Sequence, residues 1–181
     1  MNLLVLLGPT ASGKTHLAVQ AARQLDGEII SADSRQVYRG LDIGSGKDLE
    51  EYGSTPYHLI DIADPGYEFS LFDFAQAFSH AFSEIKSRNR LPILCGGTGL
   101  YLDAVLQGYE LVKVGENKVL RQELEPLPLA SLQERLQALR PEQHNTTDLE
   151  DRSRLIRAIE IAVGEELATA RPLELPDLNP I

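Results

Sequence analysis

One short motif limits what this chain can fold into more than any other feature. Residues 8–15 read Gly-Pro-Thr-Ala-Ser-Gly-Lys-Thr and match the phosphate-binding pattern G-x-x-x-x-G-K-[ST]. An apolar run at 3–7 precedes the motif, and apolar residues at helical spacing follow it at 16–25. A continuous apolar run is typical of a strand that is buried on both faces of a parallel sheet. Strand, loop and helix in this order predict a phosphate-binding loop within an α/β fold.

Further strand and helix patterns alternate along the first 108 residues. Short apolar segments at 28–32, 58–62 and 92–95 predict three more strands, and the segment 71–88 predicts a long amphipathic helix. This alternation implies right-handed βαβ crossovers and a parallel sheet. We therefore expect an α/β protein whose residues 1–108 form a P-loop NTPase-like parallel sheet with helices on both faces.

The pattern changes after residue 108. Residues 109–150 show no strand pattern and predict a small helical insertion with one or two short helices around Pro126 and Pro128. Residues 151–166 are amphipathic and predict a helix, which we expect to belong to the core and to return to the active site. The proline-containing segment 167–181 is expected to be an irregular tail.

The composition of the chain favours a cytoplasmic protein without membrane contact. Hydrophobic residues make up 43% of the 181 residues, and no apolar run reaches the length of a membrane span. The single cysteine, Cys95, excludes an internal disulfide and fits a reducing compartment. The four histidines are scattered, which argues against a zinc site. The net charge of −10 opposes binding to polyanions, so contact with RNA requires a local basic patch.

Each residue type of the phosphate-binding motif has a physical role. The glycines let the backbone wrap so that consecutive N–H groups point at phosphate oxygens, and the following helix adds its positive dipole end. The lysine supplies a point charge, and the threonine hydroxyl is a ligand for Mg²⁺. The candidate diphosphate ligands of the loop are Gly8, Thr10, Ala11, Ser12, Gly13, Lys14 and Thr15. Kinases, NTPases and diphosphate-releasing transferases all use such a loop.

Polar residues also follow two of the predicted strands. Asp33 ends the segment 28–32, which we expect to lie beside the strand that precedes the phosphate-binding loop. Ligands of open α/β sheets bind at the carboxyl ends of the strands. By position alone, Asp33 fits a general base and the surroundings of Mg²⁺ equally well. Gly96 and Gly97 follow another strand, and with Thr98 they are expected to let the backbone approach a ligand.

Several of these segments together resemble the tRNA dimethylallyltransferases. The resemblance covers residues 8–15, 31–44, 58–61 and 96–101. A later run fits that family's D-x-x-R-x-x-R-A-x-E motif with Asp151, Arg154, Arg157, Ala158 and Glu160. Five ordered motifs are far more specific than a phosphate-binding loop alone.

The resemblance implies transfer of a dimethylallyl group from dimethylallyl diphosphate to the exocyclic amine of an adenine, with Mg²⁺ on the diphosphate. The first expected acceptor is the adenosine beside the anticodon of tRNA. Asp33 is then the general base, and the other catalytic candidates are Lys14, Thr98 and Arg154. Arg157 joins the diphosphate ligands. The expected acceptor contacts are Asp33, Ser34, Arg35, Gln36, Thr98 and Tyr101.

Other readings stay open at this point. The family continues into a basic helical region that grips tRNA, whereas this sequence stops at residue 181 and carries five basic against eight acidic residues in 109–150. His144 and Asn145 also lie too early for the family's usual H-P-N-D. Free AMP as acceptor, a non-catalytic phosphate-binding module and a small-molecule kinase are therefore the alternatives. Arg154 and Arg157 are also placed to pair with Asp151 and Glu160 on a solvated helix. The oligomeric state does not follow from the sequence.

Overall fold

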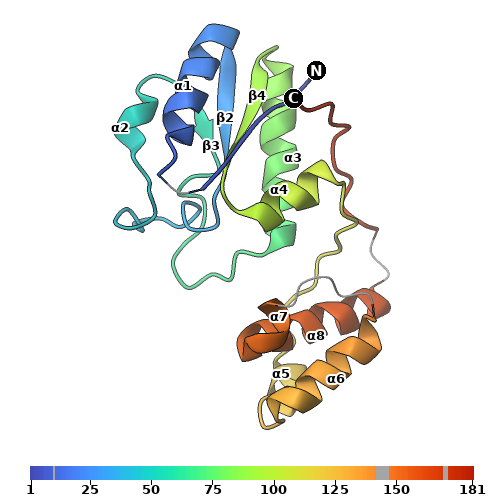
Figure 1. Cartoon of the computed structure of the whole chain (residues 1–181). Coiled ribbons are helices and arrows are strands. Elements are labelled where there is room, and N and C mark those ends of the chain that lie inside the picture. Colours follow the sequence, from blue (N-terminus) through green and yellow to red (C-terminus); the bar gives the residue numbers. More distant parts are fainter. Residues whose placement is uncertain (10, 142–146, 169–170) are drawn as a thin grey trace. The chain divides into compact units, whose positions relative to one another are not determined.

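The computed structural model describes residues 1–9, 11–141, 147–168 and 171–181. The chain divides into two compact units (Figure 1). Unit 1 comprises Met1–Glu110 and Leu173–Ile181, and unit 2 comprises Leu111–Pro172. Apart from two helices at Leu49–Tyr52 and Gly99–Leu106, the secondary structure of unit 1 follows the predicted alternation of strands and helices.

A four-stranded parallel sheet forms the centre of unit 1, with the strand order β1-β4-β2-β3. Its strands are β1 (Leu4–Leu7), β2 (Gly27–Ala32), β3 (Tyr57–His58) and β4 (Leu91–Gly96). Its helices are α1 (Lys14–Leu25), α2 (Leu49–Tyr52), α3 (Leu71–Ser87) and α4 (Gly99–Leu106). Figure 1 shows α1 and α3 on opposite sides of the sheet. The predicted α/β class with helices on both faces is confirmed.

Two expectations about the strands are wrong. We expected the second strand to lie beside the first, but β4 lies between β1 and β2. We also expected a strand over 58–62, whereas β3 ends at His58 because Leu59 and Asp61 have left-handed φ angles of 65° and 56°. The N–H group of Asp61 donates to the carbonyl of Gln36 over 3.0 Å. The segment after β3 therefore follows the loop that leaves β2 instead of extending the sheet.

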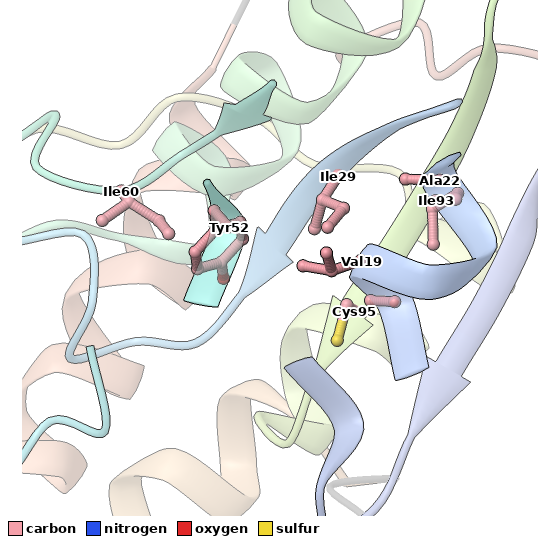
Figure 2. Packing of buried hydrophobic residues seen from close by; sticks show 8 residues of the cluster. Val19, Ala22, Ile29, Tyr52, Ile60, Ile93 and Cys95 are labelled. Carbon is pink, nitrogen blue, oxygen red and sulfur yellow. The ribbon is translucent and has the colours of Figure 1, made fainter. Parts of the chain in front are cut away.

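Alternating residues of the central strands build a core on each face of the sheet. One hydrophobic cluster joins α1 to the sheet (Figure 2), and its members include Val19, Ala22, Ile29, Tyr52, Ile60, Ile93 and Cys95. Ile30 and Leu94, one position further along β2 and β4, are also fully buried. Because successive side chains of a strand point to opposite faces, these two residues serve the α3 side. Every residue of β2 is buried, as expected for the centre of a parallel sheet.

A buried carboxylate lies near the amino end of β2. Glu28 is 2% exposed, and it accepts hydrogen bonds from the Arg88 guanidinium over 2.9 and 2.8 Å. His58 contacts its Oε2 at 2.7 Å, and Arg90 contacts its Oε1 at 3.3 Å. The hydrogen bonds from Arg88 outweigh burial and, with His58, lower the pKa of Glu28 to about 2. This charge cluster lies at the strand ends opposite to those that carry Asp33.

The end of the chain pairs with the edge of the sheet in unit 1. Residues 171–179 form neither helix nor strand. Pro180 then forms a parallel bridge with Leu3, and the N–H groups of Val5 and Ile181 donate to the carbonyls of Ile181 and Leu3 over 2.8 and 3.1 Å. These bonds satisfy backbone groups of β1 that would otherwise form an open edge.

Unit 2 is a small helical unit. Its described helices are α5 (Lys118–Leu124), α6 (Leu129–Leu139), α7 (Thr147–Glu150) and α8 (Arg152–Leu167). Its core is an aliphatic cluster that contains Leu120, Leu124, Leu132, Leu136, Leu155, Ile156 and Ile159. The expected short helices around Pro126 and Pro128 are confirmed as α5 and α6. The helix at 151–166 packs with them in this unit, principally against α6.

Candidate active site

A pocket of about 550 Å³ lies in unit 1 at the carboxyl edge of the sheet. Gly96 at the end of β4 is in register with both Leu7 of β1 and Ala32 of β2. The segments that follow these three strand ends therefore start at the same level. The lining comes mainly from four segments, 11–15, 33–36, 44–46 and 95–98. The structure thus brings most of the predicted site residues into one pocket.

The phosphate-binding loop shapes one side of this pocket. Ala11 and Gly13 have left-handed φ angles of 61° and 79°, and Gly13 caps the start of α1. Alternation with left-handed residues turns successive N–H groups to one side, which is the geometry of an anion-binding nest. The ammonium of Lys14 donates to the carbonyl of Pro9 over 2.6 Å. The loop therefore holds its lysine at the pocket, while the predicted ligand Thr10 lies outside the described residues.

Gly8 and Gly97 explain how the loop meets β4. A side chain added at Gly8 would place its Cβ 3.2 Å from the Ser12 hydroxyl. A Cβ at Gly97 would lie 3.1 Å from the carbonyl of Gly8 and 3.9 Å from Nζ of Lys14. Both positions therefore keep the space beside the loop and its lysine clear.

Gly96 also has a role within the sheet that the sequence did not indicate. A Cβ at this position would lie 2.2 Å from the carbonyl oxygen of Ala32. The backbone of β4 thus closely approaches the backbone of β2 at this position, and the predicted approach to a ligand remains a prediction. The N–H group of Thr98 donates to the same carbonyl over 3.1 Å. The absence of a side chain at Gly96 therefore draws the ends of β2 and β4 together.

Asp33 is half-buried and faces this pocket. Its Oδ1 accepts hydrogen bonds from the N–H groups of Arg35 at 2.9 Å and Gln36 at 3.4 Å, which closes an Asx turn. Oδ2 of Asp33 has no hydrogen-bond partner within the part of the chain that the structure describes. One oxygen therefore fixes the carboxylate, and the other is free to accept a proton.

Thr98 ties the end of β4 to the segment after Asp33. Its hydroxyl oxygen accepts a hydrogen bond from the N–H group of Ser34 over 3.0 Å and donates to the Ser34 hydroxyl over 3.4 Å. Ser34, Arg35 and Thr98 all line the pocket. The predicted contacts of these residues with the acceptor remain predictions.

Gln36 and Tyr101 have roles within the protein that the sequence did not indicate. The Gln36 amide oxygen accepts from the Ser31 hydroxyl over 2.9 Å, and its nitrogen donates to the carbonyls of Gly46 and Ser45 over 3.2 and 3.5 Å. Tyr101 is 5% exposed, stacks on Phe74 with ring centroids 4.0 Å apart, and does not line the pocket. Tyr101 is thus a core ring in this structure.

The lining also contains residues that sequence reasoning missed. The segment 44–46 forms one wall, and Glu51, Tyr52 and Cys95 complete the surface. Glu51 contacts Nδ1 of His16 at 3.4 Å, which places an acidic group near the start of α1. Burial raises the pKa of the Cys95 thiol to about 11, although Lys14 opposes the shift, so this cysteine stays protonated at neutral pH. Gly44 and Gly46 on either side of Ser45 are a sequence signal that could have indicated this wall.

The donor groups of the pocket suit a metal ion that is shared with a diphosphate. Thr15 is half-buried and lines the pocket. Within the described ranges, no group of three or more His, Cys, Asp or Glu residues is placed to hold a metal. Mg²⁺ usually keeps several waters and binds one or two protein oxygens together with substrate phosphates. One hydroxyl in a diphosphate cradle fits that chemistry.

A family model described as IPP transferase matches residues 36–175, which is more than half of the chain. The chain belongs to this family. It is 66% identical over 180 residues to tRNA dimethylallyltransferase 2 of Syntrophotalea carbinolica, covering 99% of this chain and 60% of that protein. It is 60% identical to tRNA dimethylallyltransferase 1 of Geotalea uraniireducens, covering 99% of this chain and 59% of that protein. The chain thus spans about 60% of the length of these curated relatives.

Solved structures of the IPP transferase family agree with the fold. The full-length tRNA isopentenylpyrophosphate transferase from Bacillus halodurans is 41% identical, with a TM-score of 0.60 over 90% of this chain and 55% of that one. A structure of a eukaryotic dimethylallyltransferase acting on tRNA has a TM-score of 0.69 over 96% of this chain and 46% of that one. At 24% identity, this second likeness concerns the fold alone.

The late motif that resembles this family lies on α8 of unit 2, and its charged residues differ in their contacts. Glu160 is 1% exposed and accepts from Arg157 at 2.5 Å and from Arg121 at 2.8 and 3.0 Å. Arg157 also donates to the carbonyl of Val114 over 3.0 Å. Arg154 is exposed, and among the described residues its guanidinium has no hydrogen bond or ion pair. Asp151 caps α8 through the N–H group of Arg154 at 3.0 Å.

No helix in the described part of the chain is both long enough and apolar enough to span a membrane.

Proposed function

We propose that the complete protein transfers a dimethylallyl group from dimethylallyl diphosphate to the exocyclic amine of an adenosine in tRNA. One observation carries the proposal: a phosphate cradle with its lysine, and a carboxylate with a free oxygen, line the same pocket. A kinase or NTPase requires the cradle, but transfer to a weakly basic amine also requires a proton acceptor beside it. Relatives named tRNA dimethylallyltransferase support tRNA as the acceptor.

The pocket residues then divide the chemistry between them. The C–O bond of the donor breaks, the new C–N bond forms at the adenine amine, and diphosphate leaves. The N–H groups at 11–15 and the ammonium of Lys14 stabilise the charge that builds on the leaving diphosphate. Mg²⁺, bound through Thr15, would neutralise part of the same charge when present. Asp33 accepts the proton that the amine loses, and Ser34, Arg35, Gln36 and Thr98 surround the acceptor.

In this proposal, an arginine of the late motif supplies a further positive charge to the diphosphate. Arg154 suits that role better than Arg157, because its guanidinium is exposed whereas Arg157 is bound to Glu160 and the Val114 carbonyl. Tyr101, buried against Phe74, would act on the acceptor only through the position of α4. A tRNA substrate and an unpaired, buried Cys95 support a cytoplasmic location.

The charge of the chain leads to a specific expectation for RNA. With a net charge of −10, the 181-residue chain alone is expected to bind tRNA no more tightly than about micromolar, since phosphate contacts supply most of such affinity. Binding of a free adenine nucleotide requires only the pocket and is expected to depend less on salt. An anticodon stem-loop bound in the nanomolar range with a steep salt dependence would contradict this expectation.

The direct test offers acceptors in parallel. The chain is incubated with radiolabelled dimethylallyl diphosphate and Mg²⁺, together with total tRNA or with AMP at the same adenine concentration. Incorporation of the label into tRNA at a single adenosine supports the proposal. Label in AMP but not in tRNA would reassign the acceptor to a free nucleotide. Binding of the diphosphate without transfer to either acceptor would leave only a phosphate-binding module.

A further inference from the structure

A lysine with a fully buried side chain lies behind one wall of the pocket. The side chain of Lys47 is 0% exposed, and its ammonium donates to Asp61 Oδ1 at 2.6 Å, to the Tyr38 carbonyl at 2.9 Å and to Asp42 Oδ1 at 3.2 Å. An ammonium has three donors, so these bonds satisfy it completely. Burial acts to lower the pKa of Lys47, but Asp61 and Asp42 outweigh it and raise the pKa above its ordinary value. The lysine therefore stays charged at neutral pH.

The loop that Lys47 closes, residues 38–47, has little apolar packing of its own. Ile43 is 98% exposed and Leu41 is 44% exposed. Gly44 and Gly46 have left-handed φ angles of 80° and 67°, which glycine adopts without strain but which also leave the unfolded loop many conformations. Polar contacts must therefore supply most of the order of this loop.

Two side chains hold the loop from different sides. Gln36 binds the carbonyls of Ser45 and Gly46 from the end of β2, as described above. Lys47 binds the start of the loop at the Tyr38 carbonyl and its middle at Asp42, and it joins both to Asp61 in the segment after β3. Removal of the ammonium would thus release the loop from its only buried cationic anchor among the described residues.

The wall that these contacts fix belongs to the acceptor side of the pocket. Residues 44–46 line the pocket, whereas Lys47 does not. The wall is bonded to Gln36, three residues after Asp33, at the end of β2. The phosphate-binding loop follows β1, and β4 separates β1 from β2. The wall is therefore bonded directly to the segment that carries the proposed base, whereas no hydrogen bond among the described residues joins it to the phosphate-binding loop.

We infer that Lys47 is a positioning residue that orders the wall at 44–46 and thereby sets the affinity for the adenine acceptor without touching either substrate. The inference rests on the proposed function for its acceptor. The ordering of the loop by Lys47 does not depend on the proposed function and can be measured independently.

The test replaces Lys47 with methionine, which keeps the length of the side chain and removes its charge. Asp42 and Asp61 retain 67% and 34% side-chain exposure, so water can reach the released carboxylates and we expect the fold to persist. The KM for the acceptor is expected to rise roughly tenfold to hundredfold, the effect of losing a charged hydrogen-bond network. The KM for dimethylallyl diphosphate is expected to stay within about twofold, because the cradle is untouched.

Arg39→Met is the matched control. Arg39 joins the same two segments, through Asp64 at 2.6 Å and the Ile62 carbonyl at 3.3 Å, but its side chain is 52% exposed. A surface pair of this kind contributes little, so the acceptor KM is expected to change less than about twofold. Arg88→Met, which disturbs the distant Glu28 cluster, shows what general destabilisation alone does to the same constants.

Hydrogen exchange at the amides of 42–47 separates failure of this inference from failure of the proposed function. Faster exchange there in Lys47→Met, with no change at 11–15, is the expected result whether or not transfer occurs. Unchanged exchange, or an equal rise of the donor and acceptor KM, would overturn the inference. If Lys47→Met does not fold, Asp42→Asn removes one of the two negative charges that face the ammonium and is expected to move both readouts in the same direction by a smaller amount. No movement of either readout in Asp42→Asn would then overturn it.

Discussion

Each unit of the molecule buries one glutamate among arginines, but only the glutamate of unit 2 belongs to a family motif. In unit 1, Glu28 binds Arg88 and Arg90 near the amino end of β2, whereas Asp33 and the phosphate-binding loop follow the carboxyl ends of the strands. In unit 2, Glu160 and Arg157 are themselves motif residues. Both lie on α8, and Arg157 donates a hydrogen bond to Glu160. The Glu28 cluster is thus separate from the motif residues of unit 1, whereas in unit 2 the buried ion pair consists of motif residues.

This difference shows that a residue which matches a motif can also stabilise the fold. Desolvating a carboxylate is costly unless its oxygens are paired, and removing one partner of a buried pair destabilises strongly. In the late motif, the contacts assign Arg157 and Glu160 to the fold of unit 2 and leave Arg154 with an exposed guanidinium.

The largest expected effect separates function from stability in unit 1. Asp33→Asn keeps an oxygen for the Arg35 and Gln36 N–H groups but cannot accept a proton. The transfer rate is expected to fall by a factor of about 10² to 10⁴ while donor affinity and unfolding stay unchanged. Asp26→Asn is the control, since Asp26 is an exposed aspartate whose left-handed φ of 48° suits asparagine. Strong loss of Mg²⁺-diphosphate affinity with an unchanged rate would instead place Asp33 at the metal.

The next effect concerns the two arginines of unit 2. Arg157→Met leaves Glu160 with fewer partners in a buried position, so the free energy of unfolding of unit 2 is expected to fall by about 3 kcal/mol. Arg154→Met is expected to change it by less than about 0.5 kcal/mol, as for an exposed surface residue. All six tyrosines and all five phenylalanines lie in unit 1. Tyrosine fluorescence therefore follows unit 1 alone, and helical circular dichroism follows both units. Equal stability of the two variants would contradict the assignment of Arg157 to the fold.

Acid is expected to weaken both units through the same chemistry. Burial raises the pKa of Glu160, but Arg121, the Asn117 N–H group and Arg157 outweigh it and lower the pKa to about 2. The pKa of Glu28 is also about 2. Because both lie below the ordinary value of 4.5, the stability they confer is full above about pH 4.5 and is lost as the pH falls toward 2.

Each carboxylate is expected to contribute up to about 3 kcal/mol over that range. Glu28→Gln and Glu160→Gln lower stability at neutral pH and flatten the acid dependence of their own unit only. Unfolding followed by tyrosine fluorescence and by circular dichroism between pH 5 and 2 distinguishes the two. A Glu160→Gln variant whose tyrosine signal loses its acid dependence would show that the clusters are not independent.

The local parts of this molecule were predictable from sequence, and the parts set by distant contacts were not. The phosphate-binding loop, α1 and α3 follow from motifs and periodicity within a few residues. The order of the strands in the sheet does not follow from the sequence, because consecutive strands need not be neighbours in the sheet. The end of β3 depends on the hydrogen bond from Asp61 to Gln36, which joins residues far apart in sequence.

The same division applies to the site. Asp33 and Thr98 were found because each follows a strand within a recognised motif. The wall at 44–46 and its anchor Lys47 were missed, since a lysine in a polar, glycine-rich loop is usually exposed. Its burial arises only when Asp61 and the Tyr38 carbonyl meet around it. Tyr101 was predicted to contact the acceptor because it lies in a motif. Its packing against Phe74 could not be predicted from the sequence.

The most direct test of the phosphate cradle is calorimetric titration of inorganic diphosphate, with Mg²⁺, into the wild-type chain and into Lys14→Ala. Lys14 bonds only the Pro9 carbonyl among the described residues, so its loss is expected to leave the tyrosine fluorescence and the circular dichroism unchanged. Lys86→Ala, at the exposed end of α3, is the control for loss of one positive charge. We expect diphosphate affinity to fall by at least about a hundredfold in Lys14→Ala and to stay at the wild-type value in Lys86→Ala. Unchanged affinity in Lys14→Ala would contradict the placement of the diphosphate on this loop.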